Sequence, residues 1–154
     1  MAVLGAAAGG GGGITPTIAF LGSQTWVPAY EMEAYVYVIG GGGSGAAACN
    51  FNNPLLGGGA GGCAISKLTL ASGTTYTATI GAGGARVSTT SYSAQSGNAG
   101  GATSFSGSGI STMTGNGGTG GTGLGSTSTT GDGGAGGTAT GGTLANFTGG
   151  KGGR

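Results

Sequence analysis

The chain has 154 residues, of which 44 are glycine, 5% are charged and none is histidine, and its net charge is +1. Ordinary soluble domains carry about 25% charged residues. A nucleic-acid surface needs clustered lysine and arginine to neutralise phosphates, and the four basic residues of this chain are spread along it. Acid–base catalysis draws mainly on histidine or paired carboxylates. The composition therefore argues against a nucleic-acid binder and against an enzyme.

The same composition predicts no catalytic residue, no cofactor-binding residue and no metal ligand. A membrane span needs about 20 consecutive apolar residues, and the apolar runs of this chain are much shorter. Collagen is excluded because glycine does not fall at every third position throughout and proline is scarce. Aperiodic glycine-rich chains are commonly disordered, but 36% hydrophobic residues with few charges favour an ordered protein.

Residues 1–13 form a Gly/Ala-rich lead that ends in the run Gly9–Gly13. We expect an attachment or tether segment there, or alternatively a tight packing element. The lead lacks the basic region and the long apolar stretch of a secretory signal, so synthesis in a cytoplasm is expected. One glycine-rich domain is expected to occupy residues 14–154.

Period-two alternation predicts strands in the first half of the chain. Residues 14–20 are predicted as an extended strand, in which Pro16 indicates either an edge strand or the start of the strand. Residues 64–70 and 74–80 are predicted to form a hairpin around the turn at 71–73, because threonine alternates with apolar residues in the second strand. Apolar residues after Gly84 occur singly, and no helix is predicted because no 3.6-residue stripe is present.

The strongest predicted strand covers residues 31–39 and has apolar residues on both faces. One face carries Met32, Ala34, Val36 and Val38, and the other carries Glu33, Tyr35, Tyr37 and Ile39. Because neither face is fully polar, we expect the strand to be packed on both sides or to lie at a subunit contact.

Glycine pairs recur at three-residue intervals in residues 117–123, 133–138 and 149–154, with a shorter copy in 57–62. Three residues per turn is the period of the polyproline II helix, which has no internal hydrogen bonds. Two glycines per turn leave two faces bare, so neighbouring helices can hydrogen-bond through their backbones while the third residue points outwards. We expect these runs to pack side by side as polyglycine II helices; the alternative is a flexible Gly/Thr linker.

Local patterns that resemble functional motifs have simpler explanations. Gly81–Arg86 follows a strand as a phosphate loop would, but no helix-opening GxGxxG and no GK[ST] is present. Glu31 and Glu33 lie on one strand face, whereas the paired acids of glycosidases flank the scissile bond of a bound sugar. Trp26 and the tyrosines are expected in core or interface packing, the alternative being a sugar-stacking platform. The sequon at Asn146 is treated as chance in the absence of a secretory signal.

Cys49 and Cys63 are the only cysteines of the chain. They provide too few ligands for a metal site without histidine or further cysteines. We expect two small buried thiols, with a disulfide between them as the alternative.

The order of these segments resembles a known family. The segments that carry the resemblance are Trp26–Pro28, Tyr35–Gly43, Thr75–Gly84, Gly97–Phe105, Ile110–Gly115 and the glycine triplets that follow. They are similar to the glycine-rich domain of bacteriophage tail-fibre and other virion fibre or adhesin proteins. A looser version occurs in the glycine-rich extracellular domain of leukocyte-type receptor tyrosine kinases. The resemblance covers residues 14–154.

The resemblance implies an all-β fold, a small antiparallel β-sandwich with glycine-rich loops packed as polyglycine II helices. It implies a non-enzymatic structural virion protein of a bacteriophage, namely a fibre, tail appendage or capsid decoration subunit. A receptor-binding adhesin that contacts a host surface receptor, and a cellular glycine-rich extracellular matrix or surface protein, are the alternatives. Expected partners are copies of the chain, as a homotrimer, and other virion proteins, without nucleic acid or membrane. Aromatic-rich loop tips of the adhesin kind are sparse, which favours a structural subunit.

Overall fold

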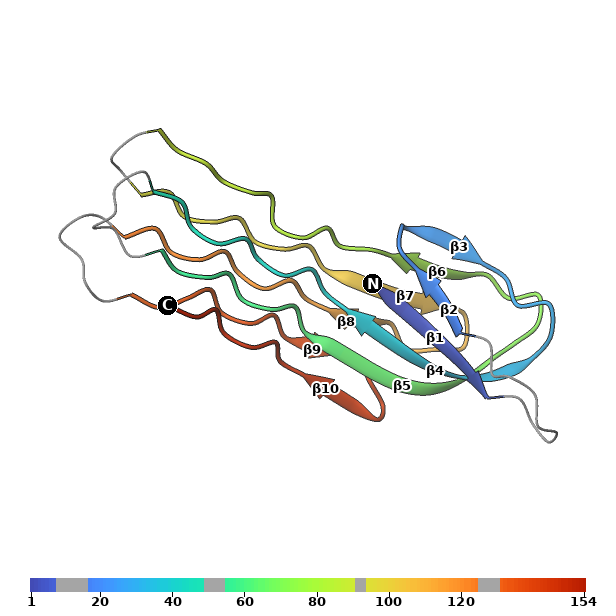
Figure 1. Cartoon of the computed structure of the whole chain (residues 1–154). Helices are drawn as coiled ribbons and strands as arrows, with labels where there is room; N and C mark the ends of the chain where they lie inside the picture. Colours follow the sequence, from blue (N-terminus) through green and yellow to red (C-terminus); the bar gives the residue numbers. More distant parts are fainter. Residues whose placement is uncertain (8–16, 49–54, 91–93, 125–130) are drawn as a thin grey trace.

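The computed structural model of the chain describes residues 1–7, 17–48, 55–90, 94–124 and 131–154. These residues form two antiparallel β-sheets, and glycine-rich segments extend from one end of the sheets (Figure 1). Within these ranges no helix occurs. The expected all-β class and the two antiparallel sheets are confirmed.

The two sheets each have five strands. Sheet A has the order β10-β5-β4-β1-β2, and sheet B has the order β3-β6-β7-β8-β9. The strands of sheet A are β1 (Ala2–Ala7), β2 (Thr17–Phe20), β4 (Met32–Ile39), β5 (Cys63–Leu70) and β10 (Ala145–Phe147). Those of sheet B are β3 (Gln24–Trp26), β6 (Tyr76–Thr79), β7 (Thr103–Gly107), β8 (Met113–Gly115) and β9 (Ala139–Thr140).

Strand β4 is the middle strand of sheet A and shows the predicted alternation. Ala34, Val36 and Val38 are buried against sheet B, whereas Tyr35 and Tyr37 are exposed on the other side. The pattern follows from the pleat of a strand, which sends successive side chains to opposite faces.

The core lies between the sheets and takes large side chains from both. Tyr76 and Phe105 stack with ring centroids 5.7 Å apart, and Trp26 packs 6.3 Å from the ring of Tyr76. The buried hydrophobic residues of the core cluster are Phe20, Ala34, Val36, Val38, Ala64, Leu70, Tyr76, Ala78, Phe105 and Met113. Burial of one of its valine, leucine, phenylalanine or methionine side chains contributes about 1.5–3 kcal/mol.

The hairpin predicted from residues 64–70 and 74–80 is wrong. Strand β5 pairs with β4 and β10, whereas β6 pairs with β3 and β7, so the two strands belong to different sheets. The chain crosses between the sheets after Leu70. The Tyr76 hydroxyl accepts a hydrogen bond from the Ala71 N–H at 3.0 Å, and the Gly73 N–H donates to the Pro28 oxygen at 3.0 Å. The turn predicted at residues 71–73 is present, but it connects the two sheets and not two paired strands.

Part of the lead expected to be a tether is a strand. Residues 2–7 form β1, which lies between β4 and β2 in sheet A, whereas residues 8–13 lie outside the described part of the chain. Met1 and Ile39 exchange two hydrogen bonds of 3.0 Å, and burial lowers the pKa of the Met1 ammonium. The expected boundary at residue 14 therefore does not separate residues 2–7 from the sandwich.

Candidate functional site

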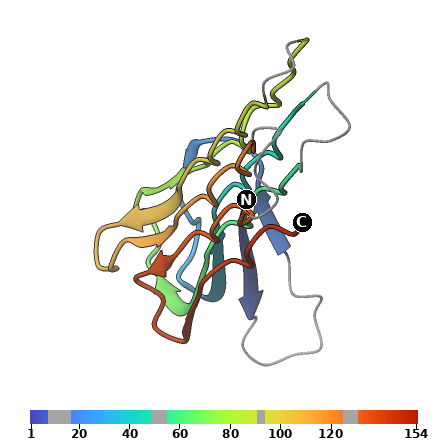
Figure 2. The same ribbon diagram turned by 90° about the vertical axis from the view of Figure 1, so that its left-hand side faces the viewer.

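The largest feature outside the sandwich is a set of glycine-rich segments that lie side by side, which we call the glycine bundle (Figures 1 and 2). Each segment directly follows or precedes a strand. The segments are 40–48 after β4, 55–62 before β5, 80–90 after β6, 94–102 before β7, 116–124 after β8, 131–138 before β9 and 148–154 after β10. The sandwich thus sets the starting position of every segment.

Backbone hydrogen bonds join the segments at three-residue intervals. In segment 40–48, one series of N–H groups donates to segment 55–62 and the next series donates to segment 94–102. The first series is Gly40 to Gly62, Gly43 to Gly59 and Ala46 to Leu56, at 2.8–3.0 Å. The second is Gly41 to Gly101, Ser44 to Asn98 and Ala47 to Gln95, at 2.9 Å. The glycine spacing predicted such pairing for residues 117–123, 133–138 and 149–154, and there Thr119 N–H donates to the Ala135 oxygen at 2.9 Å and Gly152 N–H to the Gly134 oxygen at 2.8 Å.

The bundle has two rows that continue the two sheets. Segments 80–90, 94–102, 116–124 and 131–138 follow the strand order of sheet B, and segments 40–48, 55–62 and 148–154 follow that of sheet A. Hydrogen bonds also cross between the rows. Examples are Gly118 N–H to Gly41 oxygen at 2.9 Å and Gly134 N–H to Gly57 oxygen at 2.8 Å. Backbone hydrogen bonds therefore link each segment both to neighbours in its own row and to segments of the other row.

Glycine occupies the positions where segments touch. A Cβ on Gly118 would overlap the backbone oxygen of Gly59, and a Cβ on Gly134 would overlap that of Thr119. The third residue of each triplet, such as Thr119 or Ala135, is exposed as the sequence predicted. The third residues of the triplets thus lie on the outside of the bundle, although Leu56 in segment 55–62 is a large side chain that is buried.

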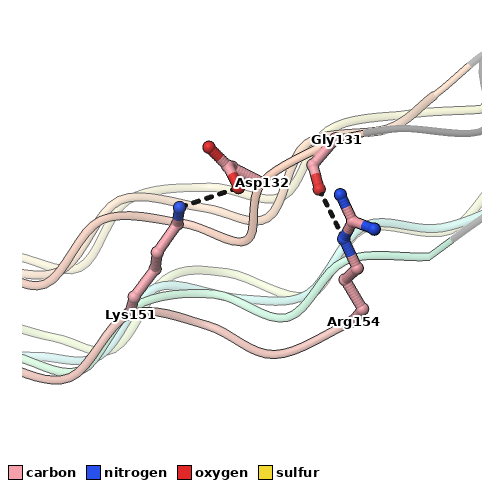
Figure 3. A network of polar contacts seen from close by, with 4 residues as sticks. All are labelled: Gly131, Asp132, Lys151 and Arg154. Atoms are coloured by element: carbon pink, nitrogen blue, oxygen red, sulfur yellow. Dashed lines mark hydrogen bonds and ion pairs between the residues drawn. The ribbon is translucent and has the colours of Figure 1, made fainter.

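The last segment is also fixed by two polar contacts, shown in Figure 3. The Lys151 ammonium lies 2.8 Å from a carboxylate oxygen of Asp132, and Arg154 Nε donates to the Gly131 oxygen at 2.9 Å. The hydrogen bond from Lys151 and its positive charge lower the pKa of Asp132. Both contacts are solvent-exposed, so they align segment 148–154 with 131–138 but add little stability.

A second feature lies on the outer side of sheet A. We call it the tyrosine face and define it by the outward residues Tyr35, Tyr37, Ile39, Cys63, Ile65 and Phe147. Strand register places Tyr37 opposite Ile65, and Cys63 opposite both Ile39 and Phe147. Tyr35 is 41% exposed, Tyr37 38% and Phe147 57%. An ion pair of 2.9 Å between Glu33 and Lys67 lies at one border of the face.

The structure brings few of the sequence candidates together. Glu31 is exposed, and Glu33 pairs with Lys67 and not with a second acid. Gly81–Arg86 belongs to segment 80–90 of the bundle, with no helix after it. The Asn146 side chain accepts from the Gly142 N–H and donates to the Gly142 oxygen, so its amide closes a local turn.

The aromatic residues divide between core and surface. Trp26 packs against Phe20 and Tyr76, as the core interpretation predicted. Tyr30, Tyr35 and Tyr37 are exposed, while the fifth tyrosine lies outside the described residues.

Cys63 has a free, half-buried thiol, and burial raises its pKa. Cys49 lies outside the described residues. Among the residues that the structure describes, no three His, Cys, Asp or Glu side chains gather as a metal ion would require. No helix in the described ranges is long and apolar enough to cross a membrane.

Comparison with protein families gives a match over most of the chain. The family described as glycine-rich domain matches residues 17–154. The chain belongs to this glycine-rich domain family. No curated protein matches the chain. The matched range of the glycine-rich domain includes strands β2–β10 and all segments of the bundle.

Two features of this glycine-rich domain were not predicted from the sequence. Strands β7 and β8 bring Phe105 and Met113 into the core, although each is a single apolar residue among Thr, Ser and Gly. The sequence carries one signal for β7, because Thr103 and Phe105 are two residues apart and would share one face of a strand. Both side chains are in fact buried. Phe147 joins the tyrosine face only through the pairing of β10 with β5, for which the sequence carries no signal.

Proposed function

We propose that the chain is a non-enzymatic structural subunit of a bacteriophage virion, in a fibre, a tail appendage or the capsid decoration. The observation that carries the proposal is the glycine bundle, in which backbone hydrogen bonds link each segment to its neighbours. Such cross-linking makes an extended element stiff without large side chains. Stiffness along one direction suits a spacer or fibre. The resemblance of the segment order to virion fibre proteins supports the same role.

We further propose that the glycine runs of the bundle adopt the polyglycine II conformation. A β-strand directs its N–H and C=O groups to two opposite sides, and so pairs with two neighbours. Segment 40–48 hydrogen-bonds to four segments, namely 55–62, 80–90, 94–102 and 116–124. A threefold helix directs its N–H groups in three directions and its C=O groups likewise in three, so it can pair with more neighbours than the two of a strand. NMR measurement of φ and ψ in these runs tests it; angles near φ −140° and ψ +135° would contradict it.

The partners proposed for this role are other virion proteins and copies of the chain, in a homotrimer for a fibre. Net charge of +1 and the lack of clustered basic residues give no support to nucleic-acid binding. A receptor-binding adhesin is the second candidate, and the exposed aromatic rings of Tyr35 and Tyr37 are the observation in its favour. A cellular surface or matrix protein is the third, with low charge and small side chains in its favour.

The proposal is tested by locating the protein. Particles from an induced or infected culture are purified by density gradient, and the chain is quantified by mass spectrometry against a known capsid protein. We expect a fixed number of copies per particle, and antibody-gold labelling at one place on the virion. Recovery from the cell envelope instead would support the cellular alternative. Inhibition of phage adsorption by the purified protein would support the adhesin.

A further inference from the structure

We propose that the outer side of two adjacent bundle segments, 40–48 and 55–62, binds a glycine-rich segment of another polypeptide in the threefold conformation (Figure 1). We call this surface the glycine face. The proposal rests on the polyglycine II conformation proposed above for the bundle. It does not rest on the virion assignment, because a cellular protein can use the same surface. The residues that define the glycine face are Gly42, Gly45, Gly58 and Gly61.

Segment 40–48 uses two of its three series of N–H groups within the bundle. The series that start at Gly40 and Gly41 donate to two neighbouring segments at three-residue intervals. The third series consists of Gly42 and Gly45, and among the described residues neither N–H has an acceptor. Successive residues of a threefold helix point about 120° apart, so this series is directed away from the acceptors of the other two. Both glycines are exposed.

Segment 55–62 repeats this arrangement. Two of its series of N–H groups donate to segments 148–154 and 116–124, at 2.8–2.9 Å. The third series, Gly58 and Gly61, donates to no group in the described part of the chain. The glycine face therefore presents two adjacent rows of free backbone donors, each with the three-residue spacing found inside the bundle.

The glycine face is also bare at positions where the chain itself has room for side chains. A Cβ on Gly42 or Gly45 would lie 3.6–3.7 Å from the nearest atom, which is ordinary van der Waals contact. Packing within the chain therefore does not require glycine at these two positions. In the row that continues sheet B, by contrast, the outward positions carry the exposed side chains of Thr119, Thr122 and Ala135. The bare positions leave space for a further backbone at the close distance that the bundle uses.

The spacing of the donors selects the chemistry of the partner. The defining residues have no side chain, so a partner can only accept hydrogen bonds from the N–H groups and pack on bare Cα atoms. A threefold helix presents one carbonyl per turn to a neighbour, about every 9.3 Å, which matches a donor at every third residue. Acceptors on one side of a β-strand recur about every 6.8 Å and fall out of step. Donor series inside the bundle pair with glycine-rich segments in this way, and the face continues that interface.

A second copy of the chain is a poorer partner than a separate segment. Carbonyl oxygens of the two segments are turned towards neighbours within the bundle, because a Cβ on Gly61 would overlap the Gly40 oxygen. A Cβ on Gly149 would likewise lie 2.7 Å from the Gly61 oxygen. Two glycine faces would therefore bring donors against donors. A glycine-rich segment outside any bundle has all its carbonyl groups free to accept.

The first experiment adds a synthetic peptide of repeated Gly-Gly-Thr triplets with terminal lysines to the ¹⁵N-labelled protein. The control peptide has valine in place of the second glycine of each triplet. Up to about 5 mM triplet peptide, we expect the amide signals of the four defining glycines to shift and their hydrogen exchange to slow by at least about fivefold. Gly22, an exposed glycine between β2 and β3, should not respond. Unchanged signals at the four glycines, or equal shifts with the valine peptide, overturn the proposal.

The second experiment blocks the face without disturbing the bundle. Gly42→Ala/Gly45→Ala adds methyl groups where the chain has room, so it should unfold at the wild-type temperature. We expect it to bind the triplet peptide at least about tenfold more weakly, because the methyl groups hold the partner backbone away. Gly22→Ala is the matched control, since a Cβ there meets nothing within 4 Å, and it should bind like the wild type. Equal binding by the double variant and the wild type overturns the proposal.

Two further measurements separate this proposal from the others. The φ and ψ angles of the labelled protein test the bundle conformation by themselves, so threefold angles without peptide binding overturn the glycine face alone. Sedimentation equilibrium of the protein without peptide tests the second copy. A wild type that associates, and a double variant that does not, would assign the face to a second copy and overturn the separate segment as its partner.

Discussion

A Cβ on Gly118 would overlap the backbone oxygen of Gly59 on another segment of the bundle. The Gly118 N–H donates to the Gly41 oxygen at 2.9 Å, and the Gly59 N–H donates to the Thr119 oxygen at 2.9 Å. The Gly118 oxygen also accepts from the Gly100 N–H at 2.9 Å, so four segments meet around Gly118. The missing side chain allows them to approach closely enough to hydrogen-bond.

We predict that Gly118→Ala destabilises the protein by about 2 kcal/mol or more, because the added methyl group must displace backbone atoms. The φ angle of Gly118 is not positive, so the effect comes from the contact and not from backbone strain. Urea unfolding gives the change in the free energy of unfolding.

Gly150→Ala is the matched control, since a Cβ on Gly150 meets nothing within 4 Å. We expect a change within about 0.5 kcal/mol, as for the exposed Thr119→Ala. Equal losses for Gly118→Ala and Gly150→Ala would show that close packing of the segments does not hold the bundle together.

The sandwich core is tested with a pair of leucines. Leu70 is fully buried between the sheets, whereas Leu21 is 78% exposed. Leu70→Ala should cost about 2–5 kcal/mol, because it removes buried methyl groups and leaves a cavity. Leu21→Ala should stay within about 0.5 kcal/mol. Thermal unfolding of both variants measures the difference, and a small effect at Leu70 would contradict the assignment of the core.

The elements that could be predicted are those whose signal is local. Strand β4 has eight residues of regular alternation, so its two faces follow from the sequence alone. Glycine pairs at intervals of three mark four of the seven bundle segments, those that contain residues 57–62, 117–123, 133–138 and 149–154. In both cases the geometry of a short stretch determines which residues face a neighbour.

The elements that were missed depend on partners far away in the chain. The turn after Leu70 fits a hairpin as well as a crossing between layers, and pairing of β5 with β4 decides between them. Phe105 and Met113 become core residues only because β7 and β8 pair with each other. The tyrosine face was half predicted for the same reason. Tyr35 and Tyr37 were expected on a second apolar face of their strand. Phe147 belongs to the same face only because β10 pairs with β5, and this pairing could not be predicted from the sequence.

Acid should weaken the attachment of the last segment. Lys151 lowers the pKa of Asp132 below its ordinary value of 3.8, so the pair stabilises the folded state above that pH. The contribution is lost as the pH falls through the folded-state pKa. We expect Asp132→Asn to melt slightly lower than the wild type at pH 6 in low salt, and the two to converge at pH 2 or in about 1 M salt. A difference that persists at pH 2 would contradict an electrostatic origin.

The junction between sheet and bundle is tested at Thr103. This side chain is fully buried, and its hydroxyl oxygen accepts a hydrogen bond from the Gly81 N–H at 3.1 Å. Gly81 lies in segment 80–90, two residues after the end of β6. Thr103→Val keeps the volume but removes the acceptor, so we expect a loss of about 1–3 kcal/mol and faster hydrogen exchange at the Gly81 amide. Thr103→Ser removes a methyl group and should cost about 1 kcal/mol without faster exchange at Gly81. Thr77→Val, on the exposed side of β6, should change neither quantity. If Thr103→Val and Thr103→Ser leave Gly81 exchange equally slow, the hydroxyl does not hold the junction.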